Sequence, residues 1–252
     1  MLSSSNIEIT RKAYPWGRAY IVEGASEAPL ILPSVTTVLK LLKNEKYEML
    51  RKQFGDKKWD KILHDAAERG NVMHRMLELF LLEWAKEKNV DRSLKKAQIF
   101  AIEESRRDDG KFTKYVDKGR DLFWNFYHDK FWENILEVVD NEAFLYTTFK
   151  GGWAGACDFV YRDLEHNLIV EDFKSSTSLK DEEDILSYKL QIAAYMFMCA
   201  EKYNEVPKVG KIRIANEQTS DIQTFEVHDY ELKDYLSQFI DLCEKFREIN
   251  NI

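Results

Sequence analysis

Apolar and polar residues alternate with period two in several stretches of the chain, and this alternation predicts β-strands. Residues 7–32 alternate in this way between turn-forming groups, which predicts a small β-hairpin at the entrance of the fold. A longer β region covers residues 135–175, where a strand that begins at Ile135 either continues through 142–148 or pairs with it. We expect two more strands at 209–216 and 222–228.

Apolar positions recur at helical spacing over residues 57–88, which predicts one long helix. Gly70 lies inside this helix, where a glycine costs about 1 kcal/mol, so we expect either a break or a close approach of another segment there. Ser34 is the expected N-cap of a short helix that ends at Leu42, because serine is favoured at helix starts. Similar patterns predict helices at 45–55, 93–107, 112–134, 183–203 and 230–250.

The order of these elements predicts an α/β fold. No repeat, low-complexity stretch or linker divides the chain, so we expect a single domain over residues 1–252. Within it, residues 1–134 would form an N-terminal hairpin and helical part. Residues 135–252 would form the catalytic sheet core with the C-terminal helices.

Composition and charge narrow the class of protein. Hydrophobic residues make up 44% of the chain and charged residues 32%, which is typical of a globular protein and excludes a disordered one. The three cysteines are far apart in sequence, which argues against a disulfide framework, an iron–sulfur cluster and a paired-cysteine zinc site. The net charge of −7 argues against a protein that coats nucleic acid, but a local basic patch or a bound cation still permits a nucleic-acid enzyme.

No apolar run approaches the roughly 18–20 residues of a transmembrane helix. The first residues also lack the basic and apolar regions of a signal peptide. We therefore expect no membrane partner. The expected location is intracellular: the cytoplasm of a bacterium or of a phage-infected host, or an organelle.

Two carboxylates and one amine stand out on neighbouring strands. Asp172 and Lys174 are two residues apart on one strand and therefore point to the same face. A hairpin with the preceding strand brings Asp158 beside them. Because buried charge is costly unless it is paired or binds a metal, we interpret the group as a divalent-metal site for cutting phosphodiester bonds.

Hydrolysis of a phosphodiester needs an activated water and compensation for the charge that builds on the phosphate and leaving oxygens. Asp158 and Asp172 supply hard oxygen ligands for Mg²⁺ or Mn²⁺, and the carbonyl of Phe173 is a further oxygen donor. Lys174 would orient the water or neutralise developing charge. Glu171 would point to the opposite face of a regular strand, so Asp172 is the preferred ligand.

Three other features have a structural as well as a functional interpretation. His74 follows Gly70 by about one helical turn and is either an ordinary helix residue or a metal ligand. The hydroxyls around Ser34 either cap a helix or face a phosphate backbone. The aromatic stripe of 112–134 is more typical of core than of a base-stacking platform, although the nearby Lys111, Lys114, Lys118 and Arg120 would suit a nucleic-acid channel.

These residues resemble the motifs of a known nuclease family. Asp158 with Asp172-Phe173-Lys174 resembles the PD-(D/E)xK motif, although Cys157 stands where the motif name has proline. Gly70-Asn71-Val72-Met73-His74 resembles the Gly-x-x-x-His helix motif of the RecB-type exonuclease branch. Gln191-Ile192-Ala193-Ala194-Tyr195 is similar to the Gln-x-x-x-Tyr motif of the same branch.

Weaker similarities extend this resemblance over about residues 33–200. Glu142 resembles the acidic residue on the strand before the first aspartate, and Ser175 resembles the small polar residue after the motif lysine. Pro33-Ser34-Val35-Thr36 is similar to a segment of the mitochondrial genome maintenance exonuclease and related phage exonucleases. The resemblance implies a restriction-endonuclease-like core, with a central mixed sheet flanked by helices and an N-terminal helical elaboration.

The resemblance also implies roles for individual residues. It implies metal ligation by His74, Asp158, Asp172 and the Phe173 carbonyl, catalysis by Lys174 with the two aspartates, and a second-shell or second-metal role for Glu142. It implies that Gln191 and Tyr195, with Ser175 and Ser34, contact the substrate or support the site. A histidine ligand tilts the metal preference toward Mn²⁺ over Mg²⁺.

The sequence therefore predicts a metal-dependent DNA exonuclease that acts on single-stranded ends in recombination, repair or phage DNA metabolism. Two alternatives remain open at this point: a structure-specific endonuclease of the same fold, and a non-catalytic DNA-binding module built on that fold. The direction of digestion, the preference for DNA over RNA and the oligomeric state are not predicted.

Overall fold

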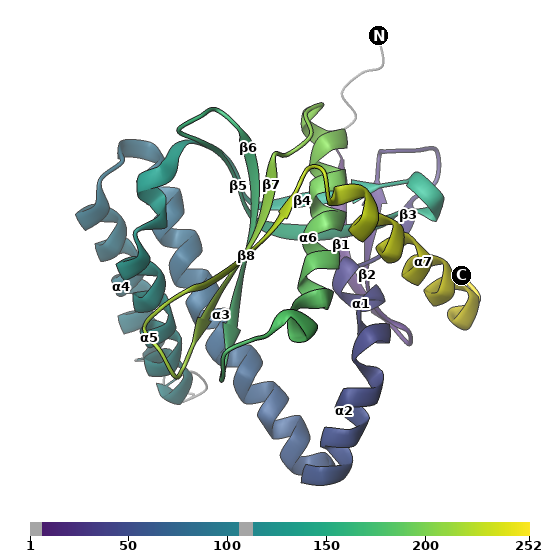
Figure 1. Cartoon of the computed structure of the whole chain (residues 1–252), viewed down its shortest axis with the longest axis horizontal. Helices are drawn as coiled ribbons and strands as arrows, with labels where there is room; N and C mark the ends of the chain where they lie inside the picture. Colours follow the sequence, from purple (N-terminus) through teal and green to yellow (C-terminus); the bar gives the residue numbers. More distant parts are fainter. Residues whose placement is uncertain (1–6, 106–112) are drawn as a thin grey trace.

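The computed structural model describes residues 7–105 and 113–252, and it contains two β-sheets, the larger of which lies between helices (Figure 1). The smaller sheet is antiparallel, in the order β1 (Glu8–Tyr14), β2 (Gly17–Glu23), β3 (Leu30–Pro33). The larger sheet is mixed and five-stranded, in the order β4 (Ile135–Thr147), β5 (Trp153–Asp163), β6 (Leu168–Ser176), β7 (Val209–Asn216), β8 (Gln223–His228). Its only parallel pair in the described part is β6 with β7.

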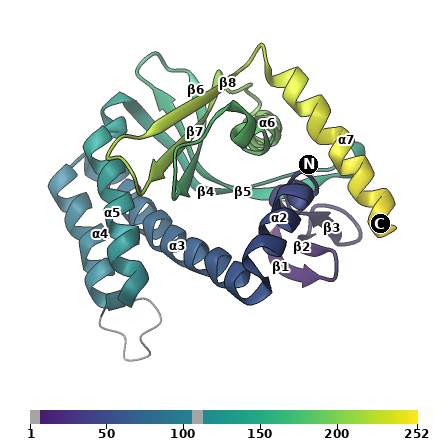
Figure 2. The same ribbon diagram turned by 60° about the horizontal axis from the view of Figure 1, so that its bottom comes forward.

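Helices cover both faces of the larger sheet (Figures 1 and 2). One face is covered by α3 (Asp56–Glu87) and α5 (Thr113–Asp129), and α4 (Val90–Ser105) packs against these two helices on the outside. The other face is covered by α6 (Glu182–Tyr203) and α7 (Leu232–Asn250), with the short α1 (Val35–Val38) beside them. The remaining helix, α2 (Lys40–Phe54), meets the first half of α3 in a V that projects from the body. This arrangement confirms the predicted α/β fold with a central mixed sheet flanked by helices.

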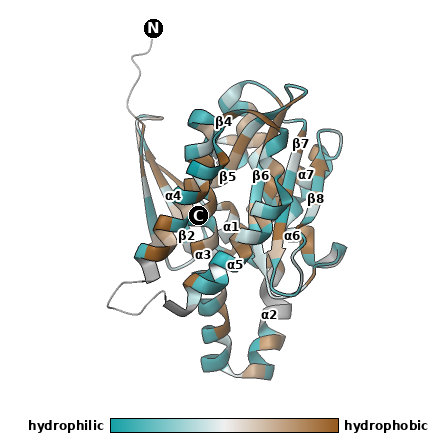
Figure 3. Ribbon diagram, turned by 90° about the vertical axis from the view of Figure 1, so that its left-hand side faces the viewer, coloured by the Kyte–Doolittle hydropathy of each residue, from teal (hydrophilic) through white to brown (hydrophobic). Residues whose placement is uncertain are grey.

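Two hydrophobic cores lie on the two sides of the larger sheet. One joins the sheet to α6 and α7 around Trp153, Ile212 and Phe239. The other joins it to α3–α5 around Phe80, Phe126 and others. Most helices are accordingly striped with hydrophobic and hydrophilic residues (Figure 3). In the described ranges, no helix is long and apolar enough to cross a membrane.

The long predicted helix is one continuous element. Gly70 does not break α3, and a Cβ placed there would lie 3.1 Å from the Ser175 hydroxyl of β6. The expected close approach is therefore the correct alternative. It lets α3 pack directly against the strand that carries Asp172 and Lys174.

The predicted boundary between the first two helices is wrong. The helix that Ser34 caps ends at Val38, and α2 then runs from Lys40 to Phe54. No glycine or proline lies between residues 35 and 54, so nothing in the backbone stops the helix near Leu42. The stop comes at Gly55, whose φ of 77° is readily adopted only by glycine.

Two other expectations are corrected or settled. The aromatic helix expected over 112–134 ends at Asp129, because Lys130 has a φ of 56° and starts a separate 3₁₀ turn over Phe131–Asn134. The strand that begins at Ile135 continues to Thr147 as a single strand with two irregularities in register. Four aromatic residues of the stripe over 112–134 are buried, which confirms that the stripe is core: Phe123, Phe126, Phe131 and Trp132.

Some expectations lie outside the described residues. These are the loop through Asp108, Asp109 and Gly110, the residues Lys111 and Phe112, and the side chain of Lys114. The single-domain organisation over 1–252 also stays a prediction. Residues from both of its expected parts nevertheless share the core between α3–α5 and the sheet.

Candidate functional site

Asp158 lies where the β5–β6 ladder ends. The antiparallel pairing runs from Arg162 with Leu168 to Phe159 with Glu171 and then stops. Beyond it, Asp158 Oδ2 accepts the N–H of Phe173 at 2.6 Å and so takes the place of a backbone partner. Because the N–H and C=O of one strand residue point to the same side, the Phe173 carbonyl also faces Asp158.

Asp172 and Lys174 share one face of β6, as the period-two pattern predicts. The Lys174 ammonium contacts Asp172 Oδ2 directly. Gln191 Nε2 from α6 donates to Asp172 Oδ1 at 3.2 Å and lies 3.0 Å from the Tyr195 hydroxyl. Both Asp172 oxygens are therefore occupied by side chains of the site, and the Gln-x-x-x-Tyr helix is the support that holds this carboxylate.

Glu142 reaches the site through an unusual backbone conformation. Asn141 pairs with Phe159 and Ala143 with Cys157, which puts Glu142 opposite Asp158. Its φ is 53°, in the left-handed region that non-glycine residues rarely adopt. Such residues persist where the surroundings impose them, often at functional sites.

His74 comes from the helix side of the sheet. Its Nδ1 lies 3.5 Å from Asp158 Oδ2. One ligand atom each of His74, Glu142 and Asp158 lies within 4.8 Å of the others, which is a spacing that one metal ion can bridge. Among the described residues this group includes Glu142 and not Asp172, so the structure gives Glu142 a more direct place than the sequence did.

Burial raises the proton affinity of the carboxylates of the site. Burial raises the pKa of Asp158 and of Asp172 to about 6, although the Lys174 ammonium acts in the opposite direction on both. Glu142 stands exposed at the cavity mouth, and partial desolvation with the charges of neighbouring carboxylates raises its pKa to about 8. Acidic groups that hold protons this tightly in the absence of a cation are suited to bind one.

The two basic groups of the site differ in charge near neutral pH. Burial and the nearby Lys174 ammonium lower the pKa of His74 to about 4, which leaves its imidazole neutral and able to act as a ligand. Burial opposes the charge on Lys174, but Asp172 and Asp158 outweigh it and raise the lysine pKa. Lys174 is therefore a cation that faces two carboxylates.

These side chains line a cavity of about 620 Å³. The Ser34 hydroxyl accepts the Thr37 N–H at 3.1 Å, which confirms the predicted helix cap. Ser34 also lies in the cavity wall, and contact of its hydroxyl with a phosphate backbone stays a prediction. Ser175 is different: it faces Gly70 on the other side of β6 and is not part of the cavity wall. The Phe173 side chain also points away, into the aromatic core beside Phe126.

Other cavity-lining residues were missed by the sequence analysis. They are Arg11 and Arg18 of the small sheet, with Asn71, Arg75 and Glu78 of α3. The three α3 residues follow the helical period of His74, so that period was a usable signal. No local pattern links residues 11–18 to the site. Lys118 and Arg120 instead pair with Glu217 and Asp117, away from this cavity.

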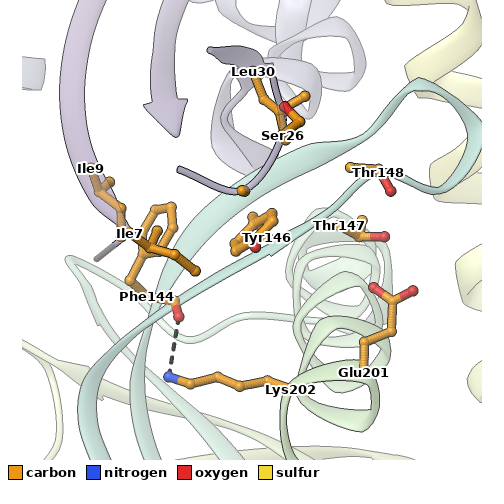
Figure 4. Close-up of a pocket in the computed structure, with 11 residues that line it drawn as sticks. Ile7, Ile9, Ser26, Leu30, Phe144, Tyr146, Thr147, Thr148, Glu201 and Lys202 are labelled. Atoms are coloured by element: carbon orange, nitrogen blue, oxygen red, sulfur yellow. Dashed lines mark hydrogen bonds between the residues drawn. The ribbon is translucent and has the colours of Figure 1, made fainter. Parts of the chain in front are cut away.

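A second cavity of about 620 Å³ lies between the small sheet and β4 (Figure 4). Its wall is mainly apolar, with Ile7, Ile9 and Phe144 among its residues. The Lys202 ammonium at its edge is bonded to the Phe144 carbonyl at 3.3 Å and to Asp140 at 2.9 Å. Among the described residues, the group that could hold a metal ion lies instead in the cavity around Asp158.

Comparisons with known proteins assign the family. No curated protein matches the chain. A solved structure of a candidate exonuclease from Eubacterium rectale is 14% identical and covers 73% of this chain and 68% of its own, with a TM-score of 0.49. The solved protein SSO0001 is 15% identical and covers 69% of this chain and 74% of its own, with a TM-score of 0.38. The model of the PD-(D/E)XK nuclease superfamily matches residues 46–251, and the chain therefore belongs to this superfamily.

Proposed function

We propose that this protein is a divalent-metal-dependent deoxyribonuclease that acts as an exonuclease on single-stranded ends, in recombination, repair or phage DNA metabolism. The observation that carries the proposal is the convergence of His74, Glu142 and Asp158 beside the Asp172–Lys174 pair. Nucleases of this superfamily generally use divalent metals. The residues present fit such a cation, because their ligand atoms converge and their carboxylates repel one another without it.

The donor set suits Mg²⁺ or Mn²⁺. Asp158, Glu142 and the Phe173 carbonyl offer hard oxygens, and Asp172 lies beside them. The neutral imidazole of His74 tilts the preference toward Mn²⁺. When bound, the cation would make water a better nucleophile and offset charge on the phosphate oxygens.

Lys174 is the proposed catalytic cation of the chain itself. Its raised pKa keeps the ammonium charged at neutral pH, where it can donate a hydrogen bond to the attacking water or to a phosphate oxygen. Asp172 fixes the position of this ammonium, and Gln191 fixes Asp172. The Tyr195 hydroxyl, one turn further along α6, accepts a hydrogen bond from Gln191 and so helps to hold Gln191 in place.

A degradation assay with end-labelled single-stranded DNA tests the proposal. The wild type is expected to release nucleotides with Mg²⁺ or Mn²⁺ and not with EDTA. Lys174→Ala and Asp158→Ala are expected to lose at least about a hundredfold in rate, since each removes transition-state stabilisation. Lys211→Ala is the matched control, because this lysine lies on the same sheet and contacts Glu226 instead of the site. Equal activity in all four proteins would refute the proposal.

Circular single-stranded DNA separates the proposed exonuclease from an endonuclease of the same fold. An exonuclease leaves the circle intact and degrades the linear form of the same sequence. Cleavage of the circle at a comparable rate would favour the endonuclease. Binding of DNA without cleavage under any metal condition would favour a non-catalytic module.

A further inference from the structure

The cavity around Asp158 has two chemically different walls. One wall carries the carboxylates of Asp158, Asp172 and Glu142. Another part comes from the N-terminal segment and carries the guanidinium groups of Arg11 and Arg18 with the hydroxyls of Ser34 and Thr36. The acidic wall would repel a polyanionic strand unless cations compensate the charge. The arginines can attract the strand and so offset this repulsion.

Arg18 is held in place by hydroxyl groups and not by an acid. Its Nη2 donates to Thr36 Oγ1 at 2.5 Å, and its Nε lies 3.4 Å from Ser34 Oγ. A guanidinium has five N–H donors, so these two contacts leave others for a ligand. Within the described ranges, the structure pairs neither Arg18 nor Arg11 with a carboxylate, whereas Arg75 in the same cavity is paired with Glu78 at 2.5 Å.

The backbone of Arg18 is fixed as firmly as its side chain. The Thr37 hydroxyl accepts the Arg18 N–H at 3.1 Å and donates to the Arg18 carbonyl at 3.0 Å. Gly17, just before it, has a φ of 131°, and a Cβ there would lie 2.5 Å from Thr37 Cγ2. Only glycine fits this contact, which keeps the arginine in register with the helix that Ser34 caps.

The arginine wall is also tied to the catalytic strand. Ser34 forms a parallel bridge with Ala154, four residues before Asp158 on β5. This bridge sets the distance between the small sheet and the metal-ligating group without passing through a loop. A ligand that spans both walls would therefore meet a preformed site, and preformed sites bind with less loss of entropy.

A phosphodiester strand has the charge pattern that these walls require. Every nucleotide of the strand adds one phosphate, so a strand with its scissile phosphate beside the carboxylates carries further negative charges close by. The arginines of the same cavity are available to compensate one of them. Arginine binds phosphate oxygens through paired N–H donors, which is the geometry that Arg18 retains.

We propose that Arg18, oriented by Ser34 and Thr36 and assisted by Arg11, binds an internal backbone phosphate of the nucleic-acid strand adjacent to the scissile phosphate. The proposal rests on the proposed nuclease function for the identity of the strand. It assigns the N-terminal sheet a role in placing substrate, and it makes the register of the strand in the site depend on a phosphate that is not cut.

Binding measurements test this subsite without requiring cleavage. The probe is a fluorescent single-stranded oligonucleotide, with Ca²⁺ as the divalent cation and its integrity checked after each titration. Arg18→Met is expected to weaken binding about tenfold and to reduce the slope of affinity against salt by about one. Arg11→Met should have a smaller effect. Lys12→Met is the matched control, because Lys12 lies in the same small sheet, next to Arg11 on β1, and does not line the cavity.

A series of oligonucleotides with one neutral methylphosphonate each identifies the phosphate. At one internal position, the neutral linkage is expected to weaken binding to the wild type about tenfold and to leave binding to Arg18→Met unchanged. The same salt slope for wild type and Arg18→Met, or the same methylphosphonate profile for both, would overturn the proposal. A loss confined to oligonucleotides with a terminal phosphate would overturn its choice of an internal one.

Two further variants guard against misfolding. Arg18→Lys keeps the charge but loses the paired donors, and Thr36→Val keeps the arginine but removes the hydroxyl that orients it. Each is expected to show part of the Arg18→Met defect with an unchanged thermal unfolding temperature. Wild-type affinity in both would overturn the proposed orientation. Absence of cleavage by the wild type would refute the nuclease function and leave the binding result to be judged separately.

Discussion

At the scale of single residues, the site collects several carboxylates, and a divalent cation would compensate their negative charge. Asp158 and Asp172 lie beside the Lys174 ammonium, Glu142 is influenced by the Arg75 guanidinium, and the His74 imidazole is neutral near neutral pH. The folded protein therefore keeps mutually repelling groups that a divalent cation would relieve. This arrangement predicts that removing one carboxylate has opposite effects with and without metal.

Glu142→Gln should make the metal-free protein more stable and the metal-bound protein less so. Partial desolvation, together with the charges of neighbouring carboxylates, raises the pKa of Glu142 to about 8. Folding at neutral pH therefore forces this carboxyl to take up a proton, at a cost in free energy that the amide does not have. The gain should be about 0.5–1 kcal/mol, since solvent at the cavity mouth screens the interaction. Thermal unfolding in EDTA and in Mn²⁺ measures both effects, with the exposed Glu137→Gln on the same strand as control. An unchanged shift with Mn²⁺ would show that Glu142 is not a ligand.

Metal affinity should rise with pH. Protons and the cation compete for the same oxygens, and the pKa of Asp158 and of Asp172 is raised to about 6. Below that pH the cation must displace these protons, so the apparent Kd should weaken as pH falls from about 7 to about 5. Loss of the Glu142 proton near pH 8 should tighten the Kd further before it levels off at higher pH. Calorimetric titration in buffers of different ionisation enthalpy reads both Kd and proton release. A flat Kd between about pH 5 and 7 would contradict the account.

Residue patterns predicted the aspartates, the lysine and the histidine of this site, and they missed its arginines. Period-two alternation placed Asp172 and Lys174 together, and the motif resemblance brought in His74, Gln191 and Tyr195. Arg18 could not be found in this way. Its position depends on a bridge between Ser34 and Ala154, which are 120 residues apart and share no local pattern.

At the scale of elements, the two faces of β6 carry charged residues with different roles. Asp172 and Lys174 face the cavity, whereas Glu171 faces α5 and is fully buried. Arg213 of β7 places Nε 2.6 Å from Glu171 and Nη1 2.8 Å from Asp129 of α5. This second group holds two strands and a helix together and has no access to the site. Its expected contribution is therefore to stability.

Arg213→Met should destabilise the fold by about 3–5 kcal/mol, because it leaves the Glu171 carboxylate buried without its cation. The double variant Arg213→Met/Glu171→Leu should recover much of this loss, since apolar residues of similar size replace a buried pair with little cost. Chemical denaturation measures all three proteins. Lys211→Met, two residues away with an exposed partner in Glu226, should change stability by less than about 1 kcal/mol. Equal loss in the single and double variants would contradict this role.

Periodicity predicted the type of the elements better than their ends. The helix ends at Gly55 and near Asn250 and the strands of 209–228 agree with the sequence. The join between α1 and α2 was misplaced, because one helix passes into the next at Leu39 without a breaking residue. The left-handed φ of Glu142 also left no trace in the sequence, since it occurs within a strand whose neighbouring residues Asn141 and Ala143 are regularly paired.

At the scale of the whole molecule, the site lies where three substructures meet. The five-stranded sheet provides the aspartates and lysine, α3 provides His74, and the small sheet provides Arg11 and Arg18. A chain with a net charge of −7 thereby presents cations where a phosphate strand would enter. The docking of separate substructures rests on long-range packing, which local sequence patterns do not encode, so this meeting point could be described only from the structure.

The central claim is that His74, Glu142 and Asp158 form the site of the divalent cation. Anomalous X-ray diffraction from crystals grown with Mn²⁺ tests it most directly. We predict one strong anomalous peak in direct contact with these three side chains, and no peak there in crystals of Asp158→Asn. A strong peak elsewhere in the molecule, with none between these residues, would contradict the account.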